Sequence, residues 1–210
     1  MTYPENYDEE TVKGPTMNLV IVNVGVYFLL AIVSSNLLVI DGSALEVLGL
    51  YNKAFFQGSL WQMITSLFVH LNLSHLGMNM VFLFIFGFRA EESYTDKEIY
   101  LIYLTSGILG NILTLFFFPL NSISAGASGS VYGILASVVA HERAVRSPKW
   151  KNVLYAMIIF LVLASGANVN IISHVFGAVG GYYTGKWLSQ KKRAKRSSFQ
   201  AQDYQEQEYR

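Results

Sequence analysis

The sequence contains no cysteine, and charged residues make up only 14% of it. The absence of cysteine excludes disulfides, thiolate catalysis and cysteine-ligated metal centres. A soluble domain usually carries about 25% charged residues, whereas hydrophobic residues reach 52% here. The net charge of +1 gives no sign of a nucleic-acid partner. The composition therefore favours a membrane protein.

Uncharged stretches predict six membrane-spanning helices. A helix that crosses a bilayer needs about 20 apolar residues. The two longest stretches exceed one crossing, and both contain polar turn formers: Pro119 and Asn121 in one, and residues 166–170 in the other. Each should therefore hold two helices. We predict an all-α, polytopic six-helix bundle, drawn from the stretches 17–40, 73–88, 99–140 and 152–185.

Clusters of basic residues predict how the chain is oriented. Four of them lie in residues 143–151, and KKRAKR follows the sixth predicted helix. Cytoplasmic loops carry an excess of Lys and Arg, so six crossings would leave both termini in the cytoplasm. We expect a cytoplasmic tail at 1–16, a membrane domain at 17–188, and a basic, then polar cytoplasmic tail at 189–210 that ends disordered. The short tails suggest a prokaryotic plasma membrane.

Residues 41–69 suit neither a crossing nor a solvated loop. They combine the charged residues Asp41, Glu46 and Lys53 with many apolar and aromatic residues, including Trp61. Aromatic rings are enriched at headgroup depth, and amphipathic segments lie in the plane of the interface. We therefore predict a loop in the outer membrane interface.

Four polar residues of the predicted helices fall at one depth. Ser128 and His174 lie a few residues from the outer ends of the fourth and sixth helices, and His75 and Asn79 share one face of the second. Polar groups inside a membrane usually face a bundle interior or a cavity. Glycines at four-residue spacing would let the fourth and sixth helices approach closely. These side chains should converge just below the outer surface.

Ser128 and His174 are the candidate nucleophile and base. A serine hydroxyl is a poor nucleophile until a nearby base takes its proton, and His141 lies about 20 Å from Ser128 along one helix. No acidic residue falls at this depth to complete a triad. We expect a Ser-His dyad, with the side chains of His75 and Asn79 and the backbone N–H of Ser128 as oxyanion donors.

These residues and their order resemble the rhomboid family of intramembrane serine proteases. The resemblance covers roughly residues 61–185 and rests on four motifs: HLNLSHLGMNM, GFRAE, GASGSVYG and SHVFGAVGG. Each motif is weak alone, and their joint occurrence with six predicted helices is specific. The resemblance implies a six-helix rhomboid bundle that is a hydrolase. It would cleave peptide bonds of membrane-anchored proteins, with the site open to the outer side. Because the site would lie below the membrane surface, we further expect substrates to enter laterally from the bilayer, and we expect hydrolysis through an acyl-enzyme.

The resemblance also implies roles for further residues. His75 and Asn79 would donate to the oxyanion, and Tyr132 would pack on the ring of the catalytic histidine. His70 would be a buried structural hydrogen-bonding residue, and Gly126 would support the site.

Two segments acquire an interpretation from the same resemblance. Residues 41–69 would be the interfacial loop, and the turn at 166–170 would be a flexible cap over the site. The family often has Trp-Arg where this chain has Trp61 and Gln62. This departure leaves open how the loop is bonded internally.

Three other hypotheses remain. The first is a catalytically inactive rhomboid-like protein that binds membrane helices. The second is a zinc protease with His70, His75 and His174 as ligands, although the sequence contains no HExxH. The third is a small transporter, although transporter sites tend to lie at the bilayer midplane. Under the protease interpretation we expect lipid and membrane-protein partners, and no cofactor, metal or nucleic acid.

Overall fold

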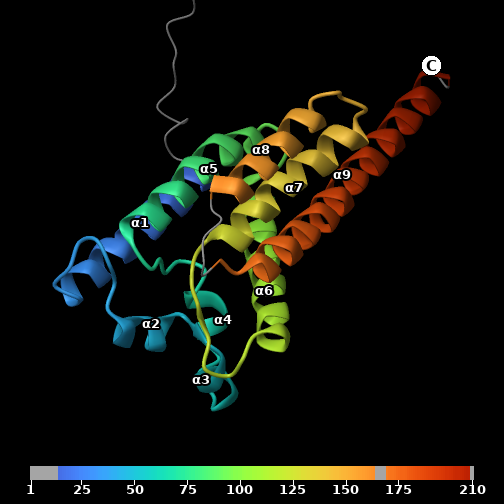
Figure 1. The fold of residues 1–210 in the computed structure, drawn as a ribbon. Helices are drawn as coiled ribbons and strands as arrows, with labels where there is room; N and C mark the ends of the chain where they lie inside the picture. The colour runs from blue at the N-terminus through green and yellow to red at the C-terminus, as the bar shows by residue number, and fades with distance from the viewer. Residues whose placement is uncertain (1–13, 164–168, 209–210) are drawn as a thin grey trace, which may run out of the picture.

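The computed structural model describes residues 14–163 and 169–208, which are mostly helical (Figure 1). Six helices of 14 or more residues occur in these ranges, in the predicted order. They are α1 (Pro15–Val33), α5 (Leu73–Glu91), α6 (Asp96–Phe117), α7 (Ser128–Ala144), α8 (Trp150–Leu163) and α9 (Ile171–Glu208).

Three of these helices, α1, α5 and α6, are long and apolar enough to cross a membrane, and α8 is a shorter apolar helix. The count of six crossings therefore stays a prediction. The predicted turn at 166–170 lies mostly outside the described residues.

Helix α7 forms the centre of the bundle. It packs against α5, α6, α8 and α9, and it is buried at every position from Ser128 to Ala140. Figure 1 shows α7 running beside α9. A helix surrounded by other helices needs small residues where their backbones meet, which explains why α7 is less apolar than α1.

Glycines bring α7 and α9 into direct backbone contact, as their spacing predicted. A Cβ added at Gly177 would overlap the backbone of Gly129, and one at Gly181 would overlap the backbone of Gly133. A Cβ at Gly185 would lie 2.7 Å from the Cβ of Ser137. Along this line the two helices have no room for side chains.

The segment 41–69 folds into short elements at the end of the bundle where α7 and α9 begin (Figure 1). The two-residue strand β1 pairs antiparallel with β2, which precedes α7, so that Leu50 faces Ser124. The segment is thereby tied to the chain that leads into α7. Its elements are α2 (Gly42–Leu48), β1 (Leu50–Tyr51), α3 (Asn52–Phe56) and α4 (Gln62–Thr65), and β2 is Ile123–Ser124.

Gln62 supplies the internal bonding that the sequence left open. Its side chain is 1% exposed, and its Nε2 donates to the carbonyl of Glu46 at 2.6 Å and to that of Val47 at 3.3 Å. Its Oε1 accepts from the backbone N–H of Tyr51 at 3.0 Å. Trp61 Nε1 also donates to the Val47 carbonyl at 2.9 Å. The amide of Gln62 therefore joins α2, β1 and α4.

Two helices end far from the positions that the sequence predicted. α1 ends at Val33, seven residues before Ile40, because Ser35 takes a φ of +48° and the Asn36 side chain accepts from two backbone N–H groups just after it. The tail predicted to be disordered instead continues α9 to Glu208. Its Gln, Ala, Glu and Lys residues favour helix, and no Gly or Pro interrupts it after Gly185.

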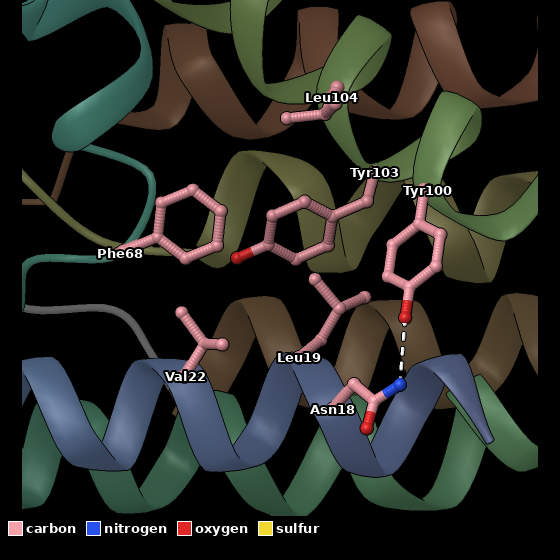
Figure 2. Close-up of a pocket in the computed structure, with 7 residues that line it drawn as sticks. All are labelled: Asn18, Leu19, Val22, Phe68, Tyr100, Tyr103 and Leu104. Atoms are coloured by element: carbon pink, nitrogen blue, oxygen red, sulfur yellow. Dashed lines mark hydrogen bonds between the residues drawn. The ribbon is translucent and has the colours of Figure 1, made fainter. Parts of the chain in front are cut away.

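Side-chain hydrogen bonds join α1 to α6 beside an apolar cavity. The cavity has a volume of about 280 Å³ and is lined mainly by apolar and aromatic residues (Figure 2). Asn18 donates to the hydroxyl of Tyr100 at 2.9 Å, and Asn23 donates to that of Tyr103 at 3.3 Å. The Tyr103 hydroxyl donates in turn to the carbonyl of Leu67 at 3.0 Å.

The glycine contact predicts a position-specific loss of stability. Gly181→Ala places a methyl group in the backbone of Gly133, so we expect it to lower the free energy of unfolding by about 1–3 kcal/mol. Gly25→Ala is the matched control, because nothing lies within 4 Å of a Cβ there, and alanine favours helix by up to about 1 kcal/mol. Denaturant unfolding in detergent measures both. Equal stability of the two variants would contradict the packing argument.

Candidate active site

Ser128 is the first residue of α7, whereas the sequence predicted it a few residues inside the helix. The helix starts there because Gly126 takes a φ of +134°, which L side chains rarely adopt. A Cβ at Gly126 would lie 2.6 Å from the His75 ring, and the Gly126 N–H donates to the Ser66 carbonyl at 2.9 Å. The first N–H groups of a helix have no intrahelical acceptor. The backbone N–H of Ser128 is therefore not used in the hydrogen bonds of α7.

The Ser128 hydroxyl lies within hydrogen-bond distance of the His174 ring. Ser128 Oγ and His174 Nε2 are 2.8 Å apart. His174 is the fourth residue of α9, and the two side chains are 9% and 5% exposed. His174 Nδ1 has no hydrogen-bond partner among the described residues. The pair therefore has the geometry in which an unprotonated Nε2 accepts the serine proton.

A stack of aromatic rings fixes the His174 ring. The Tyr132 ring lies 4.6 Å from it with an interplanar angle of 27°, and Phe160 lies 4.7 Å from Tyr132 at 16°. Phe82 continues the stack at 4.1 Å from Phe160. The four rings come from α9, α7, α8 and α5, so four helices position the His174 ring. Nothing in the sequence separates Phe160 and Phe82 from the other apolar residues of their helices.

His75 and Asn79 lie on one face of α5, beside the start of α7. Asn72 caps this helix by accepting from the His75 N–H at 2.8 Å, and the His75 ring reaches Gly126, two residues before Ser128. Asn79 is 1% exposed, and its amide donates to the His75 carbonyl at 2.8 Å. The structure thus brings His75 against the loop before the serine, and it leaves one N–H of the Asn79 amide for another acceptor.

His70 lies under the same loop and is fully buried. The Ala127 N–H donates to His70 Nε2 at 3.4 Å, and the His75 ring centroid is 5.2 Å from that of His70. Burial, and then the neighbouring His75, lower the His70 pKa to about 3. His70 is therefore neutral at physiological pH, and its Nε2 supports the residue directly before Ser128.

Asn170 anchors the beginning of α9, a role that the sequence analysis missed. Its amide donates to Thr114 Oγ1 at 2.8 Å and to Ser124 Oγ at 3.1 Å, and its Oδ1 accepts from the Ser173 N–H at 3.0 Å. Asn is a favoured N-cap residue, and this preference was the available signal. Because His174 directly follows the capped residue Ser173, Asn170 fixes the position of His174 relative to α6 and β2.

Comparison with known proteins identifies the family to which this chain belongs. Residues 57–191 match the family model described as the rhomboid domain. The chain belongs to the rhomboid family. The family and the apolar helices together indicate an integral membrane protein.

Several rhomboid relatives are similar over about two thirds of this chain. A Bacillus subtilis protein described as putative rhomboid protease YdcA is 30% identical over 147 residues, which cover 68% of this chain and 74% of the relative. Arabidopsis thaliana RHOMBOID-like protein 6, mitochondrial, is 36% identical over 69% of this chain and 48% of its own length. Bacillus subtilis rhomboid protease GluP is 28% identical over 67% of this chain and 28% of its own length. The chain therefore spans about half or less of the latter two relatives.

The histidines of this rhomboid do not form a metal-ligand cluster. Among the described residues, no three His, Cys, Asp or Glu side chains come together in a way that could hold a metal ion. The set of His70, His75 and His174, which the sequence left as an alternative, therefore lacks the geometry of a zinc site.

The buried, neutral His70 predicts a pH dependence of stability. Its folded pKa of about 3 is below the ordinary 6.5, so only the unfolded chain takes up a proton as the pH falls below 6.5. Stability is lost over this range, by about 2 kcal/mol between pH 7 and pH 5. His70→Asn keeps an acceptor for the Ala127 N–H and does not titrate. We expect denaturant unfolding in detergent to show a shallower loss for this variant, and an equal pH slope would refute the assignment.

Proposed function

We propose that this protein is an intramembrane serine endopeptidase that cleaves membrane-anchored proteins. The 2.8 Å distance between Ser128 Oγ and His174 Nε2 carries the proposal. Both side chains are nearly buried in an integral membrane protein, where polar groups are costly and tend to be functional. The names of YdcA and GluP, which describe rhomboid proteases, support the same activity.

In the proposed reaction, His174 takes the hydroxyl proton while Ser128 Oγ attacks the scissile carbonyl carbon. The tetrahedral intermediate collapses when the C–N bond breaks, and His174 returns the proton to the leaving amine. Water then attacks the acyl-enzyme with His174 again as the base. Release of the carboxylate product restores the serine hydroxyl.

The developing oxyanion needs hydrogen-bond donors. We assign this role to the Ser128 N–H, which α7 does not use, to the His75 ring beside Gly126, and to the second N–H of the Asn79 amide. Removing one such donor typically costs 10²–10³-fold in rate. Since Asn79 also donates to the His75 carbonyl, it would both position His75 and bind the oxyanion.

We also propose that the six long helices are six crossings. The termini would be cytoplasmic, and the segment 41–69 would lie in the outer interface. Water would then reach Ser128 through a polar cavity from the outer side, and substrates would enter from the bilayer. The segment's bonds to the chain before α7, between β1 and β2, support its place beside the site.

Substitution of the dyad tests the activity directly. Ser128→Ala and His174→Ala should each lower cleavage of a membrane-anchored reporter by at least about 10³-fold, because they remove the nucleophile or its base. Ser130→Ala is the matched control: Ser130 is buried in the same helix, two residues along, and its hydroxyl has no partner among the described residues. The measurement is the cleavage rate of purified protein in detergent.

Two outcomes would count against the protease. If Ser128→Ala cuts as fast as Ser130→Ala, then Ser128 is a packing residue. If the wild type binds the reporter helix without cutting it, the inactive helix-binding protein becomes the better description.

The buried site predicts a preference for substrates that unwind. A helical backbone hides its peptide bonds, so a Gly-Ala pair near the cut should raise the cleavage rate of an otherwise poly-Leu membrane segment roughly fivefold, given that glycine disfavours helix by about 1 kcal/mol. Paired reporters with and without the Gly-Ala pair measure the ratio. Equal rates would show that unwinding does not limit the reaction.

A further inference from the structure

A hollow with three basic side chains lies where α7 leads into α8, at the opposite end of α7 from Ser128. Its volume is about 360 Å³. Neither the Ser-His pair nor its supporting residues take part in it. It is lined by Arg143, Arg146, Ser147, Pro148, Trp150 and Lys151.

The three cations of the hollow are not neutralised within the described part of the chain. The ion pairs found there use Arg89 and Lys192 as their cations. Glu142, the acid next in sequence, is buried and pairs with Arg89 of α5. Like charges gathered in one hollow repel one another, so an anion bound between them would be stabilised.

Arg146 occupies a backbone position that usually belongs to glycine. α7 ends in a Schellman motif, in which the Arg146 N–H donates to the Arg143 carbonyl and the Ser147 N–H donates to the Glu142 carbonyl. The residue at this position is left-handed, and Arg146 has a φ of +59°. Glycine adopts this conformation without strain, whereas arginine does not. The arginine therefore sits at a position where it costs backbone stability, which points to a use for its side chain.

Trp150 places the hollow at the membrane surface. Its ring holds the Arg143 guanidinium at 5.3 Å and the Lys151 ammonium at 5.9 Å in cation–π contacts. One and two turns further along α8, Leu154 and Ile158 are exposed apolar residues, as expected for a surface that faces lipid. Tryptophan is enriched at headgroup depth.

We propose that this hollow binds the phosphate group of an anionic phospholipid headgroup. Arginine donates to phosphate oxygens in bidentate fashion, and basic pockets beside membrane helices suit such headgroups. The lipid-facing α8 and the interfacial Trp150 favour a lipid over a soluble phosphate. The inference does not depend on proteolytic activity.

Fluorescence of Trp150 tests the proposal. The full chain carrying Trp61→Phe and Trp187→Phe keeps Trp150 as its one tryptophan. In mixed micelles, brominated phosphatidylglycerol should quench Trp150 at a mole fraction well below that needed for brominated phosphatidylcholine. The variant Arg143→Gln/Arg146→Gln/Lys151→Gln should raise the half-quenching fraction at least tenfold, since each charge contributes roughly fivefold. The control removes the same charge from exposed sites and should shift the half-quenching fraction less than twofold. It is the triple variant Lys97→Gln/Lys191→Gln/Lys195→Gln.

A single substitution separates binding from folding. Arg146→Gly suits the left-handed backbone, so it should unfold at the same or a higher denaturant concentration, yet raise the half-quenching fraction roughly fivefold. Three results would overturn the proposal: equal shifts for both triple variants, unchanged quenching in Arg146→Gly, or loss of phosphatidylglycerol quenching when excess inorganic phosphate is added. The last would make the hollow a site for free phosphate.

Discussion

The backbone contact between α7 and α9 sets the distance between the serine and the histidine. Gly129 follows Ser128 directly, Gly177 lies three residues after His174, and a Cβ at Gly177 would overlap the backbone of Gly129. A side chain at either glycine would push the helices apart by more than the few tenths of an ångström that a hydrogen bond tolerates. The small residues of α7 are therefore a geometric requirement of the Ser-His pair.

The loop before α7 depends on contacts from other parts of the chain. The Ser66 carbonyl holds the Gly126 N–H, His70 holds the Ala127 N–H, and β1 pairs with β2. Gln62 stabilises the segment that supplies these partners. The segment 41–69 therefore supports the backbone on which Ser128 sits, in addition to any part that it plays at the membrane surface.

The sequence predicted what depends on composition and spacing, and it missed what depends on contacts between distant residues. The uncharged stretches predicted the six long helices, and the glycines four residues apart predicted the contact of α7 with α9. The role of Phe160 could not be predicted, because any apolar residue of α8 has the same pattern. The left-handed backbone conformation of Arg146 could not be predicted from the sequence, because the residue in this conformation after a helix is usually glycine. The polar composition of residues 197–208 is typical of a disordered tail, yet the helix propensity of its Gln, Glu and Ala residues lets α9 continue through it.

The distance between the two ends of α7 indicates how deep in the membrane the proposed site lies. Arg143 follows Ser128 by 15 residues, which is about 23 Å of helix at 1.5 Å per residue. The hydrocarbon core of a bilayer is about 30 Å thick. If Arg143 binds a headgroup at one boundary, Ser128 lies about 7 Å or more inside the other, and further inside if the helix is tilted. A serine at that depth meets the peptide bonds of a membrane segment near its end, and hydrolysis there requires that the protein itself admit water.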